Sequence, residues 1–211
     1  RGATALSVMI CFALVHLAAS TPYRTEHFAQ RRDHFRSGHD AEQLWSQRYL
    51  INDAHWVKGS GGPILFYTGN EGPITAFYEA CGFMTQVLAP KLGALLLFAE
   101  QRFYGTSQPF GLQSQTREAL ELLTTEQVLA DYAALLTALK PLLNASRSPI
   151  ISFGGSYGGT LATLFRLKYP HITAGSLAAS APLGYYSPTQ WTSRGVDQYT
   201  WFRTVQRVSV K

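Results

Sequence analysis

The sequence predicts an α/β fold in which helices cover both faces of a mostly parallel sheet. Short runs of continuous apolar residues bounded by glycine are typical of strands buried on both faces. These runs alternate along the 211-residue chain with longer segments whose apolar residues recur at helical spacing. Hydrophobic residues make up 46% of the chain, which is enough for one sizeable core.

Strands and helices are expected in alternation. We predict strands at 47–52, 63–68, 94–99, 150–153 and 173–180, and helices at 76–92, 124–143 and 160–169. Pro63–Thr68 and Ala94–Ala99 are continuous apolar runs, whereas Thr124–Leu143 carries its apolar residues at helical spacing. Thr21–Gly38 is polar and has no clean periodicity, so no element is predicted there.

The strand predicted at 150–153 runs directly into Gly154-Gly-Ser-Tyr-Gly158, which fits the pattern G-x-S-x-G. A strand, a sharp turn and a helix in this order form the nucleophile elbow of the α/β-hydrolase fold. A side chain at Gly154 or Gly158 would collide with the neighbouring backbone of such a turn. We therefore expect an α/β-hydrolase fold with Ser156 as the catalytic nucleophile. The alternative is a structural turn, since glycine-rich turns are common between strands and helices.

Two oxyanion-hole donors are expected around this serine. The backbone N–H of Tyr157 follows the nucleophile and starts the next helix, where free amides favour developing negative charge. A second donor normally comes from the loop after the third strand, which makes Gly69 or Asn70 the candidate. Asn70 and Glu71 could also meet a charged substrate terminus. The alternative for this loop is an ordinary glycine-rich turn.

The other members of a catalytic triad are missing from this sequence. An activated serine needs a histidine base and a carboxylate that orients it, and in this fold they follow the serine in the order acid, then histidine. Downstream of Ser156 stand only His171 and Asp197, in the wrong order, and His171 is expected near the opposite end of the sheet. Surface or loop-capping roles suit both better, and Arg102 is interpreted as part of a structural ion pair.

The first residues differ in character from the rest. Ala5–Ala19 is nearly all apolar, follows Arg1 and ends in small residues, which predicts a signal peptide at 1–20 rather than a buried helix or an uncleaved anchor. We expect no stable membrane insertion after its cleavage. Residues 21–183 are expected to form the α/β domain, and 184–211 the start of a cap region or a divergent tail. Asn144 begins a glycosylation sequon on a predicted loop.

Composition excludes several functional classes. The net charge of +5 is mild and its basic residues are scattered, which argues against nucleic-acid binding. There is no phosphate-binding glycine loop of the P-loop type and no His or Cys cluster with metal spacing, so neither cofactor nor metal is expected. With Cys11 in the predicted signal peptide, Cys81 is either a buried thiol or paired with sequence outside this chain.

Several segments between residues 30 and 183 resemble one family of serine peptidases, which includes dipeptidyl peptidase II, lysosomal Pro-X carboxypeptidase and thymus-specific serine protease. The matching segments are Arg31–Phe35, Tyr67–Gly72, Phe98–Gly105, Pro109–Gly111, Phe153–Gly159, Lys168–His171 and Ala178–Pro182. Leu122–Asp131 looks most like dipeptidyl peptidase II. Gln101 departs from the family pattern, where histidine is usual, and residues after Leu183 match poorly.

The resemblance implies an α/β-hydrolase domain with a helical insertion after the sixth strand. It maps Ser156 onto the nucleophile, Tyr157 and the Gly69–Gly72 loop onto the oxyanion hole, and Asn70 onto a residue that helps hold the substrate's amino terminus. It places the acid and histidine beyond Lys211.

The family members are lysosomal or secreted glycoproteins, often dimeric, that cleave peptides next to proline. The expected function is therefore a serine exopeptidase of dipeptidyl-peptidase type, acting through an acyl-enzyme on peptides next to proline or alanine. A Pro-X carboxypeptidase, an esterase or lipase, and a non-catalytic product are the alternatives. The 211-residue chain by itself is expected to be inactive. A homodimer is possible for the longer protein.

Overall fold

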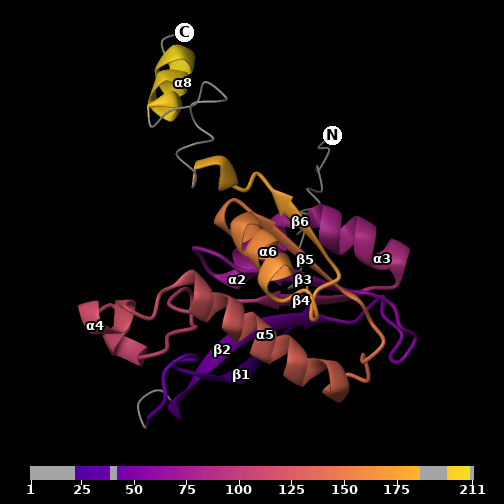
Figure 1. The fold of residues 1–211 in the computed structure, drawn as a ribbon. Coiled ribbons are helices and arrows are strands. Elements are labelled where there is room, and N and C mark those ends of the chain that lie inside the picture. The colour runs from indigo at the N-terminus through magenta and orange to yellow at the C-terminus, as the bar shows by residue number, and fades with distance from the viewer. Residues whose placement is uncertain (1–21, 39–41, 186–198, 210–211) are drawn as a thin grey trace, which may run out of the picture.

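The computed structural model describes residues 22–38, 42–185 and 199–209 (Figure 1). One six-stranded sheet has the order β1-β2-β4-β3-β5-β6. The strands are β1 Arg24–Arg31, β2 Leu44–Asn52, β3 Ile64–Thr68, β4 Leu95–Ala99, β5 Ile150–Gly155 and β6 Gly175–Ala179. The β1–β2 and β2–β4 pairs are antiparallel, and the β4–β3, β3–β5 and β5–β6 pairs are parallel. The predicted mostly parallel sheet is confirmed.

Helices cover both faces of this sheet (Figure 1). The helical elements are α2 Ile74–Ala80, a π-helix Phe83–Leu88, α3 Ala89–Leu92, α4 Arg117–Leu120, α5 Thr125–Leu142, α6 Tyr157–Lys168 and α8 Thr200–Ser209, with 3₁₀ turns at Gly111–Gln113 and Leu183–Tyr185. Helices α5 and α6 pack on one face, and α2, the π-helix and α3 pack on the other. At the start of α5, the Thr124 side chain accepts a hydrogen bond from the Gln127 amide, so the threonine caps the helix.

Two hydrophobic cores lie on either side of the central strands. Alternate residues of β3 and β4 point to opposite faces, so Phe66 packs toward α5 and α6 while Leu65 packs toward α2. Every residue of both strands is buried. This explains why these strands are continuous apolar runs in the sequence rather than alternating ones.

The structure departs from the sequence prediction in several places, and α4 and α8 form where no helix was predicted. Strand β1 forms within the polar segment where no element was predicted, and most of its side chains are exposed. The helix predicted at 76–92 is broken, with a π-helical segment between α2 and α3. Helix α6 starts at Tyr157, directly after the serine, rather than at Thr160.

The predicted signal peptide at 1–20 lies outside the described residues. Among the residues that the structure describes, no helix is both long and apolar enough to cross a membrane. The predicted boundary at residue 183 stays a prediction, because most of the segment that follows it, 186–198, is outside the described ranges.

Candidate functional site at the strand–helix elbow

Ser156 occupies a turn that only a strained backbone can make. It follows the last residue of β5 and precedes the first residue of α6, with φ of 54° and ψ of −124°. Positive φ is uncommon for a residue other than glycine and is costly unless the surroundings enforce it. Here the Ser156 amide donates to the Ala179 carbonyl of β6 at 3.0 Å, and the side chain is exposed. The turn presents the hydroxyl to solvent at the amino end of a helix.

The glycines around the serine are required by close packing. A Cβ added at Gly154 would overlap the Gly158 carbonyl and lie 2.6 Å from the Thr68 hydroxyl oxygen. A Cβ at Gly158 would lie 2.8 Å from the Thr68 carbonyl oxygen and 2.9 Å from Oδ1 of Asn70. By contrast, a Cβ at Gly155 would meet nothing closer than the Tyr67 hydroxyl, at 3.8 Å. The expected collisions at the first and third glycines are confirmed.

Thr68, the last residue of β3, ties the elbow to the neighbouring strand. Its hydroxyl oxygen is 2.9 Å from the Phe153 carbonyl oxygen and 2.8 Å from that of Gly158, and its side chain is fully buried. The hydroxyl therefore bridges the strand before the serine and the helix after it. Sequence analysis did not single out Thr68, which looks like the end of an apolar strand.

The loop after β3 lies against the start of α6. Its first amide, from Gly69, donates to the Ala99 carbonyl at 3.1 Å, and the Gly72 amide donates to the Asn70 carbonyl at 2.7 Å. The Gly69 carbonyl accepts a hydrogen bond of 2.6 Å from the hydroxyl of Tyr132 in α5. Within the described residues, the Asn70 amide has no hydrogen-bond acceptor. Of the two candidate amides, the one from Gly69 is thus already paired and the one from Asn70 is available.

The Asn70 side chain is buried beside the elbow, while its neighbour Glu71 is exposed. Nδ2 of Asn70 donates to a carboxylate oxygen of Glu71 at 2.8 Å. Oδ1 of Asn70 is buried and finds no donor among the described residues. Because buried acceptors are normally paired, this oxygen is a candidate for a donor that the described chain does not supply.

The described histidine that follows Ser156 in the sequence, His171, is not placed to serve the serine as a base. The loop that carries His171 adjoins the amino end of β5, since the Ala174 amide donates to the Ile150 carbonyl at 2.8 Å. Ser156 follows the carboxyl end of the same strand, so the expected position of His171 at the opposite end of the sheet is confirmed. Asp197 lies outside the described residues.

A second histidine has a carboxylate partner, but the pair is structural. Nε2 of His34 is 2.8 Å from Oδ1 of Asp131, in α5. Both carboxylate oxygens of Asp131 also accept hydrogen bonds of 2.7 Å from the fully buried Arg102 guanidinium. The interpretation of Arg102 as a member of a structural ion pair is confirmed.

Glu100 organises the loops beside this ion pair. Its buried carboxylate accepts hydrogen bonds from the Arg48 guanidinium, from the Ile74 amide at 3.0 Å and from the Ser107 hydroxyl at 2.8 Å. The Ile74 amide starts α2, directly after the Gly69–Pro73 loop. Glu100 therefore holds the carboxyl-terminal end of the candidate oxyanion loop, through its hydrogen bond with the Ile74 amide.

A pocket of about 330 Å³ lies next to the elbow. Its walls are mostly apolar and include Gly154, Gly155, Met84, Leu177 and the aromatic ring of Tyr67. Burial is the main reason that the pKa of Tyr67 is raised to about 12, so this phenol stays neutral. The pocket could take an apolar side chain close to the serine.

Cys81 also lines this pocket and forms no disulfide within the described residues. Its thiol is half-buried, and burial raises its pKa above the usual value. It is therefore less reactive than an exposed thiol.

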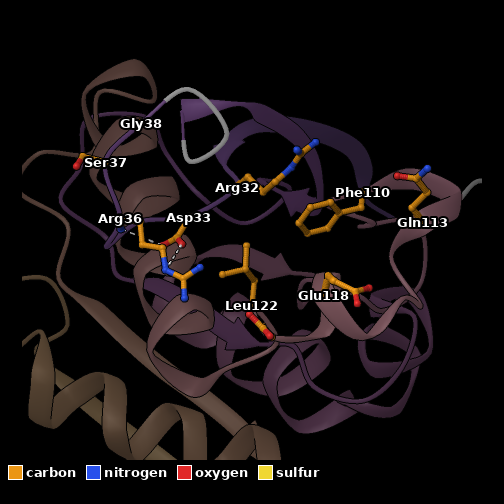
Figure 2. A pocket seen from close by; sticks show the side chains of 10 residues that line it. Arg32, Asp33, Arg36, Ser37, Gly38, Phe110, Gln113, Glu118 and Leu122 are labelled. Atoms are coloured by element: carbon orange, nitrogen blue, oxygen red, sulfur yellow. Dashed lines mark hydrogen bonds and ion pairs between the residues drawn. The ribbon is translucent and has the colours of Figure 1, made fainter.

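A pocket of about 580 Å³ opens between the loop after β1 and the α4 region, away from the elbow (Figure 2). Its charges are of both signs, from Arg32, Arg36 and Glu118. The Arg32 guanidinium lies over the Phe110 ring, 4.3 Å from the ring centre, and its Nε donates to the Pro109 carbonyl at 3.2 Å. The arginine thus holds two loops together, which explains part of the Arg31–Phe35 segment structurally.

The predicted glycosylation site and the possibility of a metal site can both be examined in the described residues. Asn144 is exposed just after α5, in a left-handed conformation with φ of 55°. Glycosylation there stays a prediction. The described residues contain no group of three or more His, Cys, Asp or Glu side chains that could hold a metal ion.

Comparison with known proteins identifies the family. Residues 30–188 match the family described as Serine carboxypeptidase S28. Lysosomal Pro-X carboxypeptidase of Mus musculus is 50% identical over 178 residues, covering 80% of this chain and 35% of the relative. Human thymus-specific serine protease is 44% identical over 138 residues, covering 65% of this chain and 26% of the relative. The chain spans about a third of the length of the Pro-X carboxypeptidases that it matches.

A solved structure supports the fold. The peroxisomal α/β-hydrolase of Saccharomyces cerevisiae superimposes with a TM-score of 0.51 at 12% identity, covering 72% of this chain and 42% of that chain. The likeness extends to the fold alone. The predicted fold class and the resemblance of the sequence segments are both confirmed, and the chain belongs to the serine carboxypeptidase S28 family.

Proposed function

We propose that the protein is a serine exopeptidase that cleaves peptides next to proline through an acyl-enzyme, with Ser156 as the nucleophile. One observation carries the proposal: in a chain of this family, the serine of a G-x-S-x-G turn stands exposed, with φ of 54°, at the amino end of α6. A strained non-glycine residue held by its surroundings is typical of a functional site. Peptide is the proposed substrate, and no cofactor is required.

In the proposed reaction, Ser156 Oγ attacks the scissile carbonyl and its proton passes to a histidine base. The amides of Tyr157 and Asn70 donate to the oxyanion that forms. We prefer Asn70 to Gly69 because the Gly69 amide is already paired with Ala99. Collapse of the tetrahedral intermediate breaks the C–N bond, the amine leaves with a proton from the histidine, and water then hydrolyses the serine ester. We propose that the histidine and its acid come from residues outside the described ranges, as the resemblance to the peptidase family implies.

Carboxypeptidase specificity is our first choice. The Pro-X carboxypeptidases are 50% and 49% identical to this chain, and their names describe cleavage of the bond after proline. The segment Leu122–Asp131, which resembles dipeptidyl peptidase II, is occupied by structural contacts: Arg102 donates to the Leu122 carbonyl at 3.2 Å and to the Asp131 carboxylate. These two contacts hold the segment in the fold and do not by themselves favour either substrate terminus.

Dipeptidyl-peptidase specificity is the second candidate, and it rests on the loop beside the serine. The exposed Glu71 carboxylate and the unpaired Oδ1 of Asn70 are acceptors that suit a substrate ammonium group. Two substrates separate the candidates. A peptide ending in Pro-Phe with a blocked amino terminus is cleaved only by the carboxypeptidase, and a Lys-Pro amide with a free amino terminus only by the dipeptidyl peptidase.

The nucleophile is tested in the protein expressed from its complete coding sequence. Ser156→Ala should reduce peptide hydrolysis to background, because no other group can form the acyl-enzyme. Ser46→Ala, which alters an exposed serine of β2, is the control and should keep full activity. Turnover by the Ser156→Ala variant would contradict the proposal. Cleavage of acyl esters without peptides would instead indicate an esterase or lipase.

We also propose that the protein enters the secretory pathway and acts in lysosomes or outside the cell. The relatives named lysosomal support this, as does the predicted signal peptide at 1–20. An exposed Asn144 is accessible to glycosylation. Removal of N-linked glycans should therefore increase the gel mobility of the secreted protein, and Asn144→Gln should reduce that increase.

A further inference from the structure

We propose that Tyr132 is a positioning residue for the oxyanion hole: its hydroxyl holds the Gly69 carbonyl so that the next amide, from Asn70, faces the substrate oxygen. The inference rests on the proposed function. Tyr132 lies in α5, 24 residues before the nucleophile, and does not itself contact substrate. It lies on the buried, mostly apolar side of that helix, and its hydroxyl is a polar group within the core.

The contact is short and fully enclosed. The Tyr132 hydroxyl donates to the Gly69 carbonyl oxygen at 2.6 Å, and the side chain is 0% exposed. Water therefore cannot compete for the carbonyl. A buried carbonyl that lost this donor would remain unpaired or would turn toward another partner.

The ring of Tyr132 is fixed by aromatic contacts from the two elements that flank the site. It packs edge-on against Phe66 of β3, with ring centres 5.4 Å apart, and against Phe165 of α6, at 6.3 Å. Strand β3 leads into the oxyanion loop, and α6 starts directly after the nucleophile. The hydroxyl is thus held in a fixed position relative to both parts of the proposed site.

Fixing a carbonyl also fixes the direction of the following amide. The peptide unit is planar and trans, so the Gly69 C=O and the Asn70 N–H point in opposite directions. With the carbonyl turned into the core toward Tyr132, the Asn70 amide points away from the core. On the other side of Gly69, its own amide is held by the Ala99 carbonyl at 3.1 Å. Both peptide units that flank Gly69 are therefore constrained.

The hydrogen bond from the Tyr132 hydroxyl to the Gly69 carbonyl does not change over the pH range in which a peptidase of this kind would work. Burial raises the pKa of Tyr132 well above its usual value, and the nearby negative charge of Asp131 adds to this effect. The hydroxyl therefore remains a donor from acid to mildly alkaline pH. Loss of activity on removing it would appear at every pH at which the wild type works.

The test is Tyr132→Phe, made in the protein expressed from its complete coding sequence. This change keeps the ring and its aromatic contacts and removes only the hydroxyl. The matched control is Tyr78→Phe on the other face of the sheet, where another buried tyrosine oxygen accepts a hydrogen bond of 2.8 Å from Nδ2 of Asn52. Both variants lose one buried hydrogen bond, so melting temperatures should fall by similar amounts.

Only Tyr132→Phe should alter catalysis. Loss of one oxyanion donor typically costs about 10²–10³-fold in kcat, so a misdirected donor should cost roughly 10-fold or more. KM should change little, because the substrate carbonyl binds before the oxyanion forms. The affinity of a peptidyl boronate, whose adduct with serine resembles the tetrahedral intermediate, should fall in parallel with kcat/KM.

Three outcomes can be told apart. A lower kcat and weaker boronate binding for Tyr132→Phe, with normal values for Tyr78→Phe, supports the positioning role. Equal kinetic losses in the two variants, or unchanged kcat for Tyr132→Phe, would overturn it. Activity that survives Ser156→Ala would instead overturn the proposed function itself.

Discussion

At the residue scale, the elbow has no room for a side chain at a glycine that lies against neighbouring backbone atoms. Gly154→Ala should destabilise the protein, because its Cβ would overlap the Gly158 carbonyl, which cannot move without bending α6. Overpacking of this kind costs about 1–3 kcal/mol or more. Gly155→Ala is the control, since its Cβ would make only ordinary contact with Tyr67 at 3.8 Å. Urea denaturation of the two variants measures the difference, and equal stabilities would contradict the account.

Asp33 links the loop after β1 to α5. Its Oδ1 accepts hydrogen bonds of 2.9 Å from the Phe35 amide and 2.6 Å from Nε2 of Gln127. Burial acts to raise the pKa of this carboxyl, but the hydrogen bonds and the Arg36 charge outweigh it, so the pKa is below its usual value. A depressed pKa means that the folded state favours the ionised carboxyl.

The stability that Asp33 contributes should therefore be complete above its unfolded pKa, about 4, and should be lost as pH falls below that value. Asp33→Asn should lower the melting temperature at pH 5 to 7, and the gap from wild type should shrink below about pH 4. Melting curves across this range test the sign. A gap that widens on acidification would count against it.

The sequence indicated the proposed nucleophile more clearly than the residues proposed to position the site around it. Ser156 and its flanking glycines were recognisable because sterics restrict the residue types that the turn accepts. Thr68 and Tyr132 were not, because each lies on an element whose pattern is already explained by burial. Their hydroxyls gain a role only when residues distant in sequence come together, as with Tyr132 and Gly69, 63 positions apart.

At the element scale, the buried ion pair of Arg102 and Asp131 fixes α5 against the sheet. Asp131→Asn would leave the fully buried guanidinium without its charged partner. Breaking such a pair typically costs about 3–5 kcal/mol. Because α5 also carries Tyr132, the change should disturb the site as well as the fold.

The exposed pair of Arg24 and Asp53 provides the matched control for this element. Its side chains are joined by hydrogen bonds of 3.0 and 3.1 Å, but both are well exposed. Asp53→Asn should cost at most about 1 kcal/mol. Chemical denaturation should show a much larger loss in the free energy of unfolding for Asp131→Asn than for Asp53→Asn. Similar losses would contradict the claim that burial makes the Arg102–Asp131 pair more important.

Some elements could not be predicted from their own sequence. Strand β1 is polar and largely exposed, and its order comes from pairing with β2, which no local pattern reveals. The π-helix Phe83–Leu88 lies in a stretch whose composition suits an ordinary helix. By contrast, β3 and β4 were predicted correctly, since burial on both faces requires continuous apolar runs.

At the scale of the whole molecule, β6 is the element that most needs a neighbour. Within the described residues it pairs only with β5, and most of its side chains are exposed. Unpaired strand edges promote association between chains. The 211-residue chain expressed by itself should therefore self-associate and melt without cooperativity. Light scattering and calorimetry test this, and a monomer with a cooperative transition would contradict it.

The family assignment and the elbow lead to one central claim, that Ser156 is the nucleophile of a serine peptidase. The most direct test is to label the protein expressed from its complete coding sequence with a fluorophosphonate, which forms a covalent bond only with an activated serine, and to analyse its tryptic peptides by mass spectrometry. The peptide from Ser148 to Arg166 also contains Ser152, and both additional serines are buried or hydrogen-bonded within the core. We predict a single adduct, on Ser156, that is absent from Ser156→Ala. An adduct on another serine, or equal labelling of the Ser156→Ala variant, would contradict the account.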